Sequence, residues 1–193
     1  MNHYDVVIVG SGLAGLTLAA ELGRKSWRVL LVDRKRCVTD AVRTTGIFVR
    51  KTIEDFPLPA ASLGPPVRRV QLHSPSGRMV SFQSRHDEYR VADMKKLYSS
   101  LLEDCLSAGV NWMPATGFES ARQVGLGLTR VQLRAAGKNH ECSAGVLVGA
   151  DGVHSRVARS LELDINREWI VGVEEVYSLR HARAPLLKSL ALP

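Results

Sequence analysis

The glycines near the start of the chain have the spacing of a nucleotide-binding loop. Gly10, Gly12 and Gly15 form a G-x-G-x-x-G pattern, in which Leu13 and Ala14 occupy the two positions before the last glycine. In such a pattern the first glycine permits a tight turn, the second lets a diphosphate approach the backbone, and the third allows close helix–strand packing. The free N–H groups of the helix that follows then face the diphosphate. The pattern therefore predicts a dinucleotide site.

The elements around these glycines are those that the site requires. Residues 4–9 are predicted to form a buried strand, residues 13–24 a helix and residues 28–32 a second apolar strand. Such a β-α-β unit implies a parallel strand pair with a right-handed crossover.

Asp33 follows the second strand and is expected to accept hydrogen bonds from adenosine ribose hydroxyls. A carboxylate here argues against NADP, whose 2′-phosphate would meet a like charge. Arg34 weakens that argument because an adjacent arginine can accommodate the phosphate, although Arg34 can equally be a solvated surface cation. These residues alone leave NAD and FAD open.

A second motif follows an apolar strand predicted at residues 145–148. Asp151 and Gly152 come directly after it, at the carboxyl end of a strand, where open α/β sheets bind their ligands. The alternative interpretation is a structural turn with a helix cap.

The G-A-D-G-x-x-S-x-V string at 149–157, paired with the N-terminal glycines, resembles the FAD-dependent oxidoreductases of the p-hydroxybenzoate hydroxylase fold. The resemblance spans residues 4 to about 178. It implies an α/β fold, a Rossmann-like FAD/NAD(P)-binding domain with a parallel sheet, plus an incomplete antiparallel substrate sheet. It also implies FAD as the cofactor and contact of Asp151 with the ribityl chain.

Residues 166–176 are more similar to the geranylgeranyl-reductase branch, which uses reduced flavin to saturate carbon–carbon double bonds. The likeness implies a prenyl-type substrate and reduced nicotinamide or another electron donor. It suggests Arg43 as a phosphate contact, unless Arg43 is only a surface cation, and places Thr44 to Gly46 beside the flavin. Since the cofactor would perform the chemistry, we name no catalytic side chain.

We expect an FAD-binding domain over residues 1–162, with a hairpin of the substrate sheet inserted at about 65–90, and the start of a truncated substrate domain over 163–193. Family members are longer, which predicts an incomplete enzyme. A strand is expected at about 169–177, and the last 15 residues are expected to lack a partner.

The other predicted elements are a helix over 93–108, capped by Asp93, and strands at 110–113 and 129–134. Ser26 occupies a turn in which relatives often have glycine. A positive φ there would cost roughly 1 kcal/mol.

Composition excludes several classes. With 193 residues, 45% hydrophobic and 23% charged, the chain is typical of a globular protein. The net charge of +7 suits an anionic small molecule, but the basic residues are too scattered for a nucleic-acid surface. Three cysteines without a C-x-x-C pair indicate unpaired thiols, and the histidines lack metal-ligand spacing. Without an apolar span long enough for a membrane, the chain is expected to be cytoplasmic.

Three alternatives to the reductase stay open. They are an FAD-dependent monooxygenase acting on an aromatic substrate, a non-catalytic FAD-binding remnant, and an NAD-binding domain whose second motif matches by chance.

Overall fold

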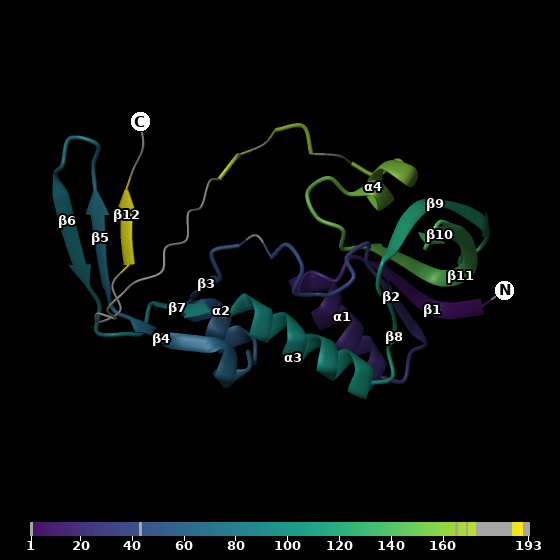
Figure 1. Cartoon of the computed structure of the whole chain (residues 1–193), viewed down its shortest axis with the longest axis horizontal. Coiled ribbons are helices and arrows are strands. Elements are labelled where there is room, and N and C mark those ends of the chain that lie inside the picture. The colour runs from purple at the N-terminus through teal and green to yellow at the C-terminus, as the bar shows by residue number, and fades with distance from the viewer. Residues whose placement is uncertain (1, 43, 165, 169, 173–186, 191–193) are drawn as a thin grey trace. The chain divides into compact units, whose positions relative to one another are not determined.

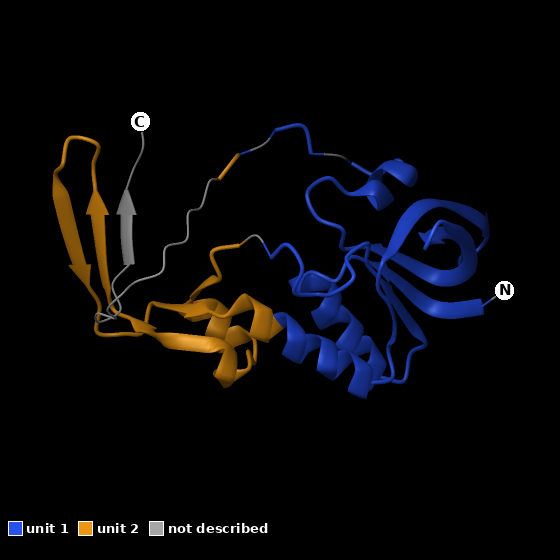
Figure 2. Cartoon of the chain, viewed as in Figure 1, with its two compact units in different colours: residues 1–42, 98–170 blue, residues 43–97, 171–193 orange. Residues whose placement is uncertain are grey.

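The computed structural model describes residues 2–42, 44–164, 166–168, 170–172 and 187–190. Backbone contacts divide the chain into two compact units (Figure 2). Residues 1–42 and 98–170 form the first unit, and residues 43–97 and 171–193 form the second.

The first unit contains a six-stranded mixed sheet (Figure 1). Its strand order is β8 (Asn111–Met113), β2 (Val29–Val32), β1 (Asn2–Val9), β11 (Lys138–Gly149), β10 (Leu128–Ala135) and β9 (Thr116–Gly125). The first four strands are parallel, and the last two continue the sheet in antiparallel order. The α/β fold with a parallel sheet that the sequence predicts is therefore confirmed.

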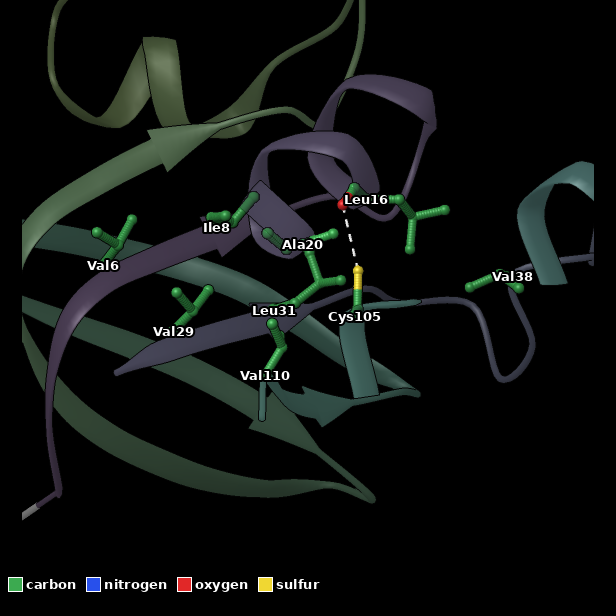
Figure 3. Close-up of a cluster of buried hydrophobic side chains, with 10 residues drawn as sticks. Val6, Ile8, Leu16, Ala20, Val29, Leu31, Val38, Cys105 and Val110 are labelled. Atoms are coloured by element: carbon green, nitrogen blue, oxygen red, sulfur yellow. Dashed lines mark hydrogen bonds between the residues drawn. The ribbon is translucent and has the colours of Figure 1, made fainter. Parts of the chain in front are cut away.

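Residues of alternating strand positions form two cores, one on each face of the sheet. Val6 and Ile8 of β1 pack with α1 (Leu13–Arg24) and with the part of α3 (Met94–Ser107) that belongs to this unit (Figure 3). There the thiol of Cys105 donates to the Leu16 carbonyl at 3.2 Å. Val7 and Val9 pack on the other face, where β9 to β11 curl over and contribute buried side chains (Figure 1).

Strand ends and loops meet at one edge of this sheet. The N–H of Gly10 donates to Val32 of β2 at 2.8 Å, and the N–H of Ala150 donates to Val9 of β1 at 2.7 Å. These bonds bring the loops after β1 and β11 together. The short helix α4 (Arg156–Ser160) begins just beyond Ala150.

The second unit contains two three-stranded sheets. One is antiparallel, with the order β3 (Ile47–Val49), β7 (Tyr89–Ala92) and β4 (Leu63–Val67). The other has the order β12 (Leu187–Leu190), β5 (Arg69–His73) and β6 (Met79–Gln83). Helix α2 (Arg50–Asp55) and a 3-10 turn (Ala60–Ser62) connect β3 to β4. The predicted hairpin is confirmed as β5 and β6, which pair antiparallel.

Several expectations about the elements need correction. β11 begins at Lys138, well before the predicted start at 145, and β3, β4, β7, β9 and α2 were not predicted. β12 pairs in parallel with β5, so part of the C-terminal segment has a partner. Of the strand expected at 169–177, residues 170–172 are described and are not in a strand, while 169 and 173–177 lie outside the described residues. The domain boundaries at 162/163 stay a prediction.

Candidate cofactor site

A cavity of about 470 Å³ lies at the carboxyl ends of β1, β2 and β11. Its lining comes from within four segments of the first unit, at residues 9–12, 33–35, 116–118 and 150–159. β1 connects through α1 to β2 on one side, whereas β11 pairs with its other side. The cavity therefore lies where the strand order reverses, the usual ligand position in open α/β sheets.

The three glycines of the loop have different structural reasons to be glycine. Gly10 has φ +106°, and a Cβ there would lie 2.3 Å from the Ala150 carbonyl oxygen. A Cβ on Gly15 would lie 1.9 Å from the Gly10 carbonyl oxygen. Gly10 thus allows the turn, and Gly15 allows α1 to approach it closely.

Gly12 is different, because no contact among the described residues requires a glycine there. Its φ is −74°, which any residue adopts, and a Cβ on it would meet no atom within 4 Å. The side chain that is missing at Gly12 leaves space beside the cavity that its backbone lines. This is the arrangement expected where a ligand must approach the backbone.

The start of α1 offers hydrogen-bond donors at the same place. Leu16 donates to Gly12, but the N–H groups of residues 12–15, which include Leu13 and Ala14, have no protein partner within the described residues. Free donors and the positive end of a helix suit a diphosphate. The residues present therefore fit the diphosphate of a dinucleotide cofactor.

Asp33 lies at the end of β2, is 8% exposed and lines the cavity. Its Oδ2 accepts from the N–H and the hydroxyl of Ser11, at 2.7 and 2.8 Å, and its Oδ1 accepts from the N–H of Lys35 at 2.9 Å. Asp33, the predicted ribose acceptor, thus also connects the end of β2 to the glycine loop through hydrogen bonds. Sequence reasoning did not identify Ser11 or Lys35, although a hydroxyl inside the glycine pattern was a visible signal.

The cavity is rich in cations. Arg34 is exposed at its edge, and α4 adds Arg156 and Arg159. Arg159 donates to the carbonyls of His154 and Ser155, at 2.8 and 3.2 Å. These positive side chains complement a diphosphate, and the two on α4 were missed because their position depends on the fold.

Lys35 is also held in place at this cavity. Its ammonium lies 4.0 Å from Asp33 Oδ2 and 5.9 Å from the centre of the Tyr98 ring. Burial raises the pKa of Tyr98. The Lys35 ammonium lies within the range of a cation–π contact with its ring.

Asp151 and Gly152 also line the cavity, and Gly152 has φ +82°. Asp151 Oδ1 accepts from the Ser155 hydroxyl at 2.6 Å, and its Oδ2 accepts from the N–H groups of Arg156 and Val157 at 2.7 and 3.3 Å. The carboxylate therefore accepts from the first N–H groups of α4, whose N-cap is Ser155, with its hydroxyl accepting from the N–H of Ala158 at 3.0 Å. These contacts are those of a turn with a helix cap, which is the alternative interpretation of this motif. Its predicted ribityl contact stays a prediction.

The remaining predicted residues are not among those that line this cavity. Thr44 and Gly46 belong to the second unit, where the Gly46 N–H donates to the Thr44 hydroxyl at 3.3 Å and Gly46 has φ +64°. Arg43 lies outside the described residues. The roles predicted for all three stay predictions.

Metal binding and membrane spanning are two further properties that the described part of the chain could show. No three side chains among its histidines, cysteines and carboxylates come together as a metal site. None of its helices has the length and apolar character to span a membrane.

The chain is similar in sequence to prenyl reductases. It is 27% identical to the geranylgeranyl diphosphate reductase of Rhodobacter capsulatus over 154 residues, covering 80% of this chain and 39% of the relative. It is also 27% identical to digeranylgeranylglycerophospholipid reductase 1 of Methanococcoides burtonii, covering 84% and 41%. The chain thus spans about two fifths of the length of these relatives.

Solved structures share the fold. A geranylgeranyl bacteriochlorophyll reductase-like protein of Thermoplasma acidophilum matches with a TM-score of 0.76 at 19% identity, over 84% of this chain and 43% of the other. The p-nitrophenol 4-monooxygenase PnpA of Pseudomonas putida matches with a TM-score of 0.73 at 16% identity, over 83% and 44%. At these identities the likeness concerns the fold alone.

A family model decides the cofactor. The model of the FAD binding domain matches residues 3–184, which is nearly the whole chain. FAD is therefore the cofactor, and the chain belongs to the FAD binding domain family.

Proposed function

We propose that this chain provides the FAD-binding part of a geranylgeranyl-reductase-like oxidoreductase, which reduces carbon–carbon double bonds of a prenyl-type substrate. The observation that carries the proposal is the open position at Gly12 beside N–H groups without a partner in the described residues, in a chain whose sequence relatives include a geranylgeranyl diphosphate reductase and digeranylgeranylglycerophospholipid reductases. The fold is shared with a monooxygenase as well, and the similarity in sequence to the two reductases supports the reductase activity over the monooxygenase activity.

The proposed roles follow the lining of the cavity. The start of α1 holds the diphosphate, Asp33 accepts from a ribose hydroxyl, and Arg34 adds positive charge at the edge. Asp151 and Gly152 are proposed to lie beside the ribityl chain.

The family resemblance suggests roles for three further residues. Arg43 is proposed as a phosphate contact, and Thr44 and Gly46 as neighbours of the flavin.

When bound and reduced, FAD would supply a hydride to the double bond, and a proton would complete the saturation. The electrons come from reduced nicotinamide or another donor. The protein's part in this chemistry is binding and orientation, and no side chain is assigned as acid or base.

The function is tested with the chain loaded with FAD, reduced with dithionite without oxygen, and incubated with geranylgeranyl diphosphate. Mass spectrometry should show products heavier by two hydrogens per reduced bond. A Gly12→Val variant, which should not retain FAD, is the matched control. Oxygen-dependent NADPH consumption with hydroxylation of an aromatic compound would instead support the monooxygenase. Bound FAD without turnover of either kind would contradict reductase activity in this chain and would leave FAD binding as its function.

A further inference from the structure

The side chain of Ser11 is fully buried, although it lies in the loop that surrounds the cavity. Its hydroxyl and its N–H both donate to the same oxygen of Asp33, at 2.8 and 2.7 Å. The two residues are separated by 22 positions in the sequence, so these bonds connect the glycine loop to the end of β2. A loop with two glycines next to Ser11 has little stiffness of its own, and these bonds restrain it.

The count of hydrogen bonds at Asp33 limits what this carboxylate can offer a ligand. A carboxylate has about four lone-pair positions, two on each oxygen. Ser11 fills both positions on Oδ2, and the N–H of Lys35 fills one on Oδ1, at 2.9 Å. One position on Oδ1 is left.

We infer that Ser11 is a positioning residue, which fixes the Asp33 carboxylate so that it presents a single acceptor to the adenosine ribose of FAD. Asp33 therefore recognises one of the two ribose hydroxyls and not both. The inference rests on FAD as the cofactor and on Asp33 as the ribose contact. It assigns to Ser11 a role that the glycine pattern alone does not require.

The test measures the dissociation constants of ADP, 2′-deoxy-ADP and 3′-deoxy-ADP by competition with FAD, whose fluorescence reports its binding. With the unmodified chain, one deoxy nucleotide should bind about tenfold more weakly than ADP, and the other within about twofold of ADP. The ratio between the deoxy nucleotide and ADP is informative, because a general loss of stability lowers all three affinities together.

The Ser11→Ala variant removes the hydroxyl and leaves the backbone bond. Its carboxylate is held less firmly, so the tenfold ratio should fall to about threefold or less. Ser11→Thr restores a hydroxyl and should restore the ratio. Ser143→Ala is the matched control, because Ser143 is also buried and its hydroxyl is 3.0 Å from His3 Nδ1, away from the cavity lining. Its ratio should equal that of the unmodified chain.

The outcomes separate this inference from the cofactor assignment. If the unmodified chain binds neither FAD nor ADP, both are overturned. If it binds them but both deoxy nucleotides lose affinity equally, Asp33 offers two acceptors and the inference alone is wrong. The inference is also wrong if Ser11→Ala binds ADP and keeps the full ratio. Even if Ser11→Ala does not fold, the measurement on the unmodified chain shows whether Asp33 binds one ribose hydroxyl or both.

Discussion

The backbone at Gly15 lies so close to Gly10 that a Cβ on Gly15 would be 1.9 Å from the Gly10 carbonyl oxygen. Because the obstacle is backbone, no side-chain rotation relieves it. We expect Gly15→Ala to lower the free energy of unfolding by roughly 1–3 kcal/mol. Urea denaturation followed by circular dichroism measures this change.

Gly12→Ala is the matched control for Gly15→Ala, since it makes the same chemical change three positions away, where a Cβ meets nothing within 4 Å. It should change the free energy of unfolding by less than about 1 kcal/mol. Equal destabilisation by the two variants would contradict the close packing of α1 on Gly10.

Asp151 has two candidate roles, and its hydrogen bonds allow them to be separated. Asp151→Ala should destabilise the start of α4 by about 1 kcal/mol, because the N–H groups of Arg156 and Val157 lose their acceptor. It should also weaken FAD binding if the carboxylate contacts the ribityl chain. Denaturation and FAD titration measure the two effects.

Ser155→Ala removes the hydroxyl that donates to Asp151 at 2.6 Å and that, as the N-cap of α4, accepts from the N–H of Ala158 at 3.0 Å, but it keeps the carboxylate. It should disturb the loop while leaving FAD affinity closer to that of the unmodified chain than Asp151→Ala does. If both variants weaken FAD binding equally, Asp151 acts only through the loop, and its predicted ribityl contact is wrong.

Ser26 has φ +61° in the turn between α1 and β2, a turn in which the family resemblance predicts glycine. Its N–H donates to the Gly23 carbonyl at 2.8 Å, which ends the helix. Ser26→Gly relieves the strain, and we expect the free energy of unfolding to rise by roughly 0.5–1 kcal/mol after the extra flexibility of the unfolded chain is counted. Ser26→Ala keeps the strain and should give no gain. A thermal unfolding midpoint no higher in Ser26→Gly than in Ser26→Ala would contradict this account.

The three cysteines differ in the pKa of their thiols. Burial raises the pKa of Cys105 and of Cys142 to about 11. Cys37 is exposed, and its hydrogen bond with the Thr39 hydroxyl, at 3.0 Å, lowers its pKa. A lower pKa gives more thiolate at any pH below it, so at about pH 8 a disulfide reagent should label Cys37 first. The two buried cysteines, Cys105 and Cys142, should react only after the protein unfolds.

Thr39→Ala tests the cause of this difference. Without the hydroxyl the pKa of Cys37 rises, and labelling should slow at about pH 8 but not at a pH well above the thiol's pKa. The pH profile of the labelling rate should therefore shift to higher pH. An unchanged profile would show that Thr39 does not stabilise the thiolate.

Local patterns predict the part of the fold that carries the glycine loop. The strand and helix around Gly10 to Gly15 are visible in the sequence because apolar positions, glycines and the Asp33 spacing all agree. β9 has no such pattern, since its apolar residues Phe118, Ala121 and Val124 are spaced by three positions. Pairing with β10, in a register interrupted by two shifts, makes it a strand.

Two other strands, β4 and the first half of β11, could not be predicted from the sequence, for different reasons. β4 contains Pro65 and Pro66, which argue against a strand, and the structure places it at the edge of its sheet with a register shift, where proline is tolerated. The first half of β11 is polar, and it becomes a strand by pairing with β10.

From the sequence, only those residues of the site that belong to a recognisable motif could be predicted. The glycines, Asp33 and Asp151 each follow a strand in sequence, and parallel strands bring such positions to one edge. The bonds of Ser11 to Asp33, and the cation of Lys35 near Tyr98, depend on which groups meet after folding. The pattern of residues in a single sequence does not predict such contacts.

The most direct test of the FAD site is the FAD content of the purified chain and of Gly12→Val. Each is purified with excess FAD and desalted, and the visible spectrum and the released nucleotide are measured. The unmodified chain should retain about one FAD per chain, while Gly12→Val should remain folded and retain less than about a tenth as much, because its side chain fills the space beside the free N–H groups of α1. A folded, colourless unmodified chain, or equal FAD in both proteins, would contradict the assignment of the cofactor to this cavity.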